Sequence, residues 1–215
     1  TISDAFEQSD SGLSLVDMME LDLLVGSGGV LSHAPRREQS ARMLIDAFLP
    51  EGITQLAVDS IFMMPQLGVL ANIDQKELAE NSRKAALEVF DKDCLIRLGT
   101  SLAPVGNAKP GALMLTAELI MPDGSNKRVE LHQGQLISVP ADYEAIKATL
   151  RPAKGLDIGA GKNEEITTII YGGVVGLIFD GRGRPFKLPV EKDKRIENLT
   201  NWSNAMSEYP LESAA

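Results

Sequence analysis

The first half of the chain alternates short apolar runs with segments of helical periodicity. Residues 21–26 (LDLLVG) form a continuous apolar run closed by glycine, which is typical of a short buried strand. From Ala41 to Phe48, apolar residues recur at i, i+3, i+4 and i+7, which predicts a helix over about 35–48 that ends at Pro-Glu-Gly. Residues 54–60 (TQLAVDS) have the pattern of a second strand. This order of elements favours an α/β arrangement.

A second helix is expected after a connection rich in methionine and proline. Asp74 and Glu77 have the spacing of a capping box, in which Asp74 is the N-cap and Glu77 lies three residues later. The residues that follow recur at helical spacing and predict one buried face. They are Leu78, Ser82, Ala85, Ala86, Val89 and Phe90.

The pattern changes near Leu95. From there to about Pro189, glycine, proline and β-branched residues increase and helical periodicity fades. Two strands are predicted on either side of a Pro-Asp-Gly turn at 122–124, in which Gly124 can adopt a positive φ. Further strands are predicted within the segments 134–140, 165–172 and 173–181. Residues 141–150 fit a short helix or a loop.

A closing helix is predicted over 191–206. Its apolar face comprises Ile196, Leu199, Trp202 and Met206. The predicted fold class is therefore α/β plus β-rich, in three parts. These are an α/β segment with a Gly-rich turn at 1–94, a mostly β domain at 95–190, and a C-terminal helix and tail at 191–215.

Composition and charge narrow the classes of partner. A net charge of −9, a sequence pI near 4.8 and 5% aromatic residues argue against a nucleic-acid-binding surface. With one cysteine, Cys94, no internal disulfide can form, which favours a reducing compartment. The longest apolar runs are too short for a membrane span, and no secretory signal opens the chain. We therefore expect a cytoplasmic protein without membrane contact.

The most distinctive motif is the turn formed by Gly26, Ser27, Gly28 and Gly29. It follows a predicted strand, and His33 lies a few residues beyond it. Missing side chains would let a flat ligand or an anion approach the backbone, and His33 could contact it. A tight turn with close packing explains the same glycines, and the spacing matches neither the P-loop nor the Rossmann fingerprint. Both interpretations stay open on the residues alone.

A second motif is the segment 179–185, which places Asp180, Arg182 and Arg184 at a turn. Arginine side chains suit carboxylate or phosphate groups, so the three residues are candidates for contact with an anion or a protein partner. The alternative is a solvated turn with a local ion pair worth about 0–1 kcal/mol. No paired carboxylates, Ser-His-Asp set or metal-ligand cluster is recognisable, so no catalytic residue and no metal site is predicted.

Three blocks carry a resemblance to a known family: LLVGSGGVLSHAP, PEGITQLAVDSIFMMPQLGVLA and GGVVGLIFDGRGRPFKLP. From about Leu21 to about Met206, the chain resembles the C-terminal part of the MutL family of glutamate mutase accessory proteins. That family is similar to the superfamily of sugar kinases, actin and heat-shock ATPases. The resemblance implies the C-terminal part of an actin-like ATPase fold followed by a mostly β domain. It also matches residues 26–29 to an adenosine-binding turn.

The resemblance implies a C-terminal fragment of an ATPase-like accessory or reactivating chaperone for an adenosylcobalamin-dependent mutase. ATP or ADP with Mg²⁺ is then expected to bind the full-length protein. The superfamily's first phosphate-binding loop has no counterpart in this chain, so we expect neither tight nucleotide binding nor catalysis by the fragment alone. The alternative is a non-enzymatic interaction module that docks a mutase subunit through the loops of the β portion. Homo-oligomerisation stays open.

Overall fold

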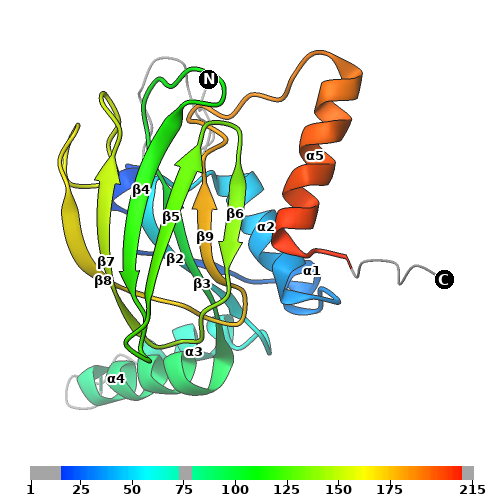
Figure 1. The fold of residues 1–215 in the computed structure, drawn as a ribbon. Coiled ribbons are helices and arrows are strands. Elements are labelled where there is room, and N and C mark those ends of the chain that lie inside the picture. The colour runs from blue at the N-terminus through cyan, green and yellow to red at the C-terminus, as the bar shows by residue number, and fades with distance from the viewer. Residues whose placement is uncertain (1–15, 73–78, 210–215) are drawn as a thin grey trace.

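Two β-sheets form the centre of the protein in the computed structural model, which describes residues 16–72 and 79–209 (Figure 1). The first sheet has the strand order β1-β2-β3-β9-β6, and the second has the order β5-β4-β7-β8. The strand bounds are β1 (Leu23–Gly26), β2 (Gly52–Asp59), β3 (Leu95–Ala103), β4 (Leu113–Ile120), β5 (Asn126–His132), β6 (Leu136–Val139), β7 (Ala145–Pro152), β8 (Ile166–Tyr171) and β9 (Gly176–Asp180).

The helices lie outside the pair of sheets. Their bounds are α1 (Gly29–Ser32), α2 (Arg37–Phe48), α3 (Met64–Ala71), α4 (Ala79–Val89) and α5 (Lys192–Met206), with short helical turns η1 (Met18–Glu20) and η2 (Phe90–Cys94). None of the helices in the described part of the chain has both the length and the apolar character that a membrane span requires.

The layers stack as the helices α1, α2 and α5, then the first sheet, then the second sheet, while α3 and α4 lie at one end of the sheets (Figure 1). One apolar core lies between α2, α5 and the first sheet, and includes Leu44, Ile178 and Trp202. Another lies between the two sheets, and includes Phe179 and Leu150. Neighbouring residues of β9 therefore point into opposite cores, as the alternation of a strand requires. The pair α3 and α4 packs separately, around a small cluster that contains the buried Cys94.

The first sheet is mixed and joins segments that the sequence pattern assigns to different parts. The pair β1–β2 is parallel, β2–β3 antiparallel, β3–β9 parallel and β6–β9 antiparallel. Strands β2 and β3 pair from Gly52↔Ala103 to Asp59↔Leu95. The boundary predicted between residues 94 and 95 therefore falls between two paired strands, and the segments 1–94 and 95–190 share this layer.

A bulge in β3 explains the requirement for glycine at position 99. Leu56 of β2 pairs with Gly99 and Ala57 pairs with Arg97, so Leu98 is the extra residue. Gly99 has a φ of +146°, and a Cβ atom there would lie 1.7 Å from the carbonyl oxygen of Gly176. Only a residue without a side chain permits β9 to pair at this point.

Most of the strands predicted from the sequence are confirmed, and the exceptions have physical reasons. The segment 141–150 is neither helix nor loop but contains most of β7, whose residues Ile146, Ala148 and Leu150 are buried at every second position. Residues 64–71 form α3, although the sequence pattern indicated only a connection. The helix α5 is confirmed, but its residues Ile196 and Leu199 are largely exposed.

The second predicted helix is confirmed as α4 only in part. Among the described residues of the predicted buried face within α4, Ala86 is buried, whereas Ala85 and Val89 are exposed. The capping box of Asp74 and Glu77 lies outside the described residues.

Candidate functional site

The Gly-rich turn lies at the carboxyl end of β1. Because β1 and β2 are parallel, the turn stands beside Asp59, the last residue of β2. The Ser27 hydroxyl lies 3.4 Å from Asp59 Oδ2, and the Ser32 hydroxyl donates a hydrogen bond of 2.6 Å to the Asp59 carbonyl oxygen. The turn is therefore fixed to the neighbouring strand from both sides.

The glycines of this turn have different roles. A Cβ atom on Gly26 would lie 2.8 Å from Leu31 Cδ1 and 2.9 Å from Leu44 Cδ2, so a side chain there would force these two leucines to shift. Gly28 has a φ of +112°, and neither Gly28 nor Gly29 would bring a Cβ atom within 4 Å of another residue. The tight-turn interpretation thus explains Gly26 by packing and Gly28 by its positive φ, whereas the space beside the backbone of Gly28 and Gly29 is open and a ligand could occupy it.

The Asp59 carboxylate is engaged by the protein itself. It is fully buried and accepts hydrogen bonds from the backbone N–H groups of Met63 at 3.1 Å and Met64 at 2.9 Å, where α3 begins. Asp59 therefore caps α3, an N-terminal role that suits a carboxylate. Within the described residues, no group of three or more His, Cys, Asp or Glu side chains is placed to hold a metal ion.

His33 is exposed and remains beside the turn. Its Nδ1 atom lies 3.2 Å from the carbonyl oxygen of Gly29, a geometry in which the ring donates the hydrogen bond. The imidazole therefore orders the turn, and its other nitrogen does not take part in this contact.

The second motif, at residues 180–184, lies at the other end of the strands of the first sheet. Strand β9 runs antiparallel to β1, because β3 is parallel to β9 and antiparallel to β2. Asp180 at the end of β9 and Gly26 at the end of β1 therefore lie at opposite ends of the strands of the first sheet. The structure does not bring the two predicted sites together.

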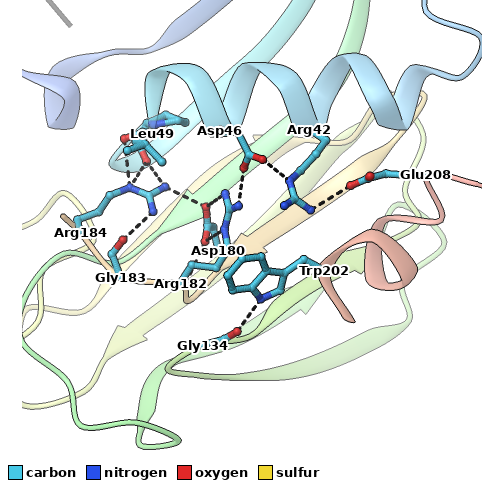
Figure 2. Close-up of polar contacts among 11 residues, drawn as sticks. Arg42, Asp46, Leu49, Gly134, Asp180, Arg182, Gly183, Arg184, Trp202 and Glu208 are labelled. Carbon is cyan, nitrogen blue, oxygen red and sulfur yellow. Dashed lines mark hydrogen bonds and ion pairs between the residues drawn. The ribbon is translucent and has the colours of Figure 1, made fainter. Parts of the chain in front are cut away.

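Asp180, Arg182 and Arg184 form a buried ionic network under α2 (Figure 2). Asp180 Oδ1 accepts hydrogen bonds from the backbone N–H and Nε of Arg182 at 3.0 and 2.9 Å. Asp180 Oδ2 accepts from Arg182 Nη2 at 2.8 Å and from Arg184 Nη2 at 2.9 Å. Burial by itself raises the pKa of Asp180, but the two guanidinium groups outweigh it and hold this pKa well below its ordinary value.

Arg184 also completes the end of α2. Its Nε donates to the carbonyl oxygen of Leu49 at 3.1 Å, and its Nη2 donates to that of Pro50 at 2.9 Å. These carbonyl groups follow the last turn of the helix, where a cation is favourable. The side chain of Arg184 is 1% exposed and that of Arg182 is 0% exposed.

The interpretation of a solvated turn with a weak local ion pair is therefore wrong, because α2 covers the three side chains. Their contact with an anion or a partner stays a prediction, and in this conformation it would require the network to open. The guanidinium groups of Arg182 and Arg184 are directed into the protein (Figure 2).

Several members of the network were missed by reasoning from the sequence. Arg182 Nη1 also pairs with Asp46 of α2, and Asp46 Oδ2 accepts from Arg42 Nε at 2.7 Å. Arg42 Nη1 pairs with Glu208, which follows α5, at 3.0 Å. The i, i+4 spacing of Arg42 and Asp46 was the available signal, whereas nothing in the sequence connects Glu208 with α2.

Trp202 of α5 packs on this network. Its ring centroid lies 5.4 Å from the guanidinium carbon of Arg182 and 5.7 Å from that of Arg42. Its indole N–H donates to the carbonyl oxygen of Gly134 at 2.8 Å. The aromatic face thus receives two cations while its polar atom is satisfied, a cation–π arrangement that holds α5 on the first sheet.

Comparison with known proteins supports the resemblance noted from the sequence. The family model described as MutL protein matches residues 11–93, a segment that contains the Gly-rich turn, α2 and Asp59. No curated protein and no solved structure showed a significant match to the chain. The relation to the actin-like ATPase fold stays a prediction.

Proposed function

We propose that the chain is part of an accessory protein for an adenosylcobalamin-dependent mutase of the glutamate mutase type, a proposal supported by the match of the MutL family model to residues 11–93. In this proposal the turn 26–29 holds the adenosine part of ATP or ADP. The nucleotide drives a reactivating or assembling role of the whole protein.

The open backbone at Gly28 and Gly29 carries the proposal. Ligands of α/β sheets bind outside the carboxyl ends of the strands, and the turn lies at the carboxyl end of β1 beside that of β2. A flat ligand edge can approach the two glycines because no neighbouring atom fills the space that a Cβ would take. The exposed ring of His33 stands next to this space.

The described residues fit the adenosine part better than the phosphates. Asp59, the carboxylate nearest the turn, is already occupied by the backbone N–H groups of α3. Phosphates and Mg²⁺ would need groups from an upstream lobe, as the resemblance implies. This division explains why weak binding and no hydrolysis are expected of the present chain, since phosphoryl transfer depends on positioning by both halves.

The test is calorimetric titration of ATP and ADP with Mg²⁺ into this chain and into a chain extended upstream. The variant Gly29→Val places side-chain atoms in the open space, where a Cβ atom has no neighbouring atom within 4 Å. Its control is Gly68→Val in α3, another helical glycine at which an added Cβ would have nothing within 4 Å. We expect binding by the extended chain, a loss of at least about tenfold in affinity with Gly29→Val, and no change with Gly68→Val. Absence of nucleotide binding by both chains would reject the proposal.

A second candidate function, a protein-interaction module, is favoured by exposed apolar side chains near the same edge. Val30 of α1, Ile61 and Phe62 of the β2–α3 connection and Val69 of α3 are 51–75% exposed. Such groups mark interaction surfaces when they gather on one face. Mutase binding that survives Gly29→Val but is lost with Phe62→Ser would favour this function over nucleotide-dependent action.

A further inference from the structure

Strand β8 forms an edge of the second sheet and lacks the usual protection of edge strands. It pairs with β7 on one side, and no strand of the described residues pairs with its other side. Its sequence, ITTIIY, has no charge and no proline. The opposite edge strand β5, by contrast, carries the exposed charges Lys127, Arg128 and Glu130. Unprotected, uncharged edges readily accept another strand.

The two sheets are offset. The second sheet ends at β8, so it does not cover the part of the first sheet that contains β1. The Thr100 hydroxyl of β3 donates to the carbonyl oxygen of Tyr171 at 2.6 Å, which places the end of β8 over β3. The core between the sheets includes no residue of β1. Leu23 and Gln55 pair with each other and face away from the helices, and both are half-buried. The second sheet thus stops short of β1.

A cavity of about 390 Å³ lies in this step between the sheets. We call it the β8 groove and define it by its lining residues. The apolar walls include Ile53, Ile158, Ile166 and Ile170, and the polar ones include Asp22 and Thr168. Its walls suit aliphatic side chains, and the free edge of β8 supplies backbone hydrogen-bonding groups along one side.

The surroundings of the groove are acidic. Residues 16–26 and 50–59 contain no lysine or arginine, whereas Asp17, Glu20, Asp22 and Glu51 make no ion pair with a described residue. Burial raises the pKa of Glu51 above its ordinary value against the lowering effect of Arg184, and the charge of Asp17 adds to the rise. A basic group that arrived here would find Glu20 and Asp22 without an ion-pair partner among the described residues, whereas Asp17 already accepts a hydrogen bond from the backbone N–H of Met19.

We propose that the β8 groove binds an extended segment of a partner protein, which adds a strand to the second sheet. The segment carries aliphatic side chains at alternate positions and at least one lysine or arginine. A strand added to β8 lies about 4.7–4.9 Å from it and directs every second side chain toward the face of β1 and β2. The basic residue then reaches the carboxylates of residues 17–22. This binding is independent of the proposed nucleotide site.

The probe is a fluorescent peptide with the sequence Lys-Val-Thr-Val-Thr-Val-Lys and blocked ends. We expect it to bind the full chain, and to bind more tightly than the same peptide with glutamate at both ends. Amide hydrogen exchange should slow when the peptide is present at the alternate residues of 166–171 whose N–H groups face the free edge, because these groups become hydrogen-bonded. A peptide N-methylated at its valines, which stand at alternate positions, lacks the N–H donors on one side of the strand. It should bind the chain at least about tenfold more weakly.

Two substitutions on the same strand provide matched variants. Thr168 is half-buried in the groove, whereas Thr167 is exposed on the other face, where its hydroxyl lies 3.0 Å from that of Thr149. Thr168→Lys fills the groove and adds a positive charge, so we expect the lysine peptide to bind at least about tenfold more weakly. Thr167→Lys should leave binding within about twofold. Asp22→Asn, which does not alter packing, should weaken the lysine peptide and not the glutamate peptide.

The outcomes separate this proposal from others. Binding that is equal for the lysine and glutamate peptides, or unchanged in both Thr168→Lys and Asp22→Asn, would overturn it. If the chain binds no peptide but sediments as a dimer that Thr168→Lys dissociates, the occupant is a second copy and the assignment to a partner segment is rejected. If Thr168→Lys does not fold, the effect of Asp22→Asn on peptide binding and the amide hydrogen exchange of residues 166–171 still test the proposal.

Discussion

Removal of the charge at Asp180 tests whether the buried network stabilises the fold. Asp180→Asn keeps the size of the side chain but leaves one oxygen where the carboxylate had two. At most, that oxygen can keep the two bonds from the backbone N–H and Nε of Arg182. The amide nitrogen then faces Nη2 of Arg182 and Nη2 of Arg184, which are both donors.

The expected cost follows from these contacts. Two hydrogen bonds to a charged group, each worth about 1.5–3 kcal/mol, are lost. Breaking a buried ion pair by removing one partner costs about 3–5 kcal/mol, because the other charge stays buried. Both routes lead to a fall of about 4 kcal/mol in the free energy of unfolding. For a chain of this size that fall corresponds to about 10 °C in melting temperature.

Urea unfolding followed by tryptophan fluorescence is the direct assay. The chain has a single tryptophan, and Trp202 is 4% exposed and packs on Arg182. The control is Glu130→Gln, which removes the charge of an exposed pair with Arg128 at 2.7 Å and should cost no more than about 1 kcal/mol. If Asp180→Asn is as mild as the control, the network does not stabilise the fold and the argument is refuted.

Two further predictions concern stability. The pKa of Asp180 is lower in the folded protein than in the unfolded chain, where it is about 3.9. The ionised carboxylate therefore stabilises the fold fully above that value, and this stabilisation is lost as pH falls toward the folded pKa. Urea midpoints measured from about pH 7 to about pH 3 should fall less steeply in Asp180→Asn than in the parent chain. Gly99→Ala should cost about 3–5 kcal/mol in the same assay because its Cβ meets Gly176, whereas Gly111→Ala, with nothing within 4 Å and a φ of +73°, should cost about 1–2 kcal/mol.

Local pattern predicted much of the secondary structure but little of the buried polar chemistry. The strand at 21–26 was predictable because a continuous apolar run closed by glycine marks a buried strand, and the strand at 54–60 was predicted from its own pattern. The strand β7 was missed, although its buried residues alternate, because the segment 141–150 was expected to be a short helix or a loop. The offset of the two sheets depends on which strands lie face to face, and no short window of sequence contains that information.

The candidate sites show the same limit. At the Gly-rich turn, sequence alone could not separate Gly26, whose Cβ space is filled by Leu31 and Leu44, from Gly29, whose space is open. At the second motif, the sequence identified the three charged residues but did not show that their side chains point into the protein. Whether an arginine points to solvent or to a helix depends on the helix, which is about 135 residues earlier in the chain.

The network also bears on what the family match covers. Residues 11–93 contain α2, yet the polar groups on the inner side of α2 find their partners elsewhere. Asp46 pairs with Arg182, Arg42 pairs with Glu208, and the carbonyl oxygens after α2 accept from Arg184. A segment that ended at residue 93 would leave these groups without partners and β2 without β3 beside it. The segment that resembles the family is therefore one side of a larger folded unit, and experiments on the Gly-rich turn need the whole chain.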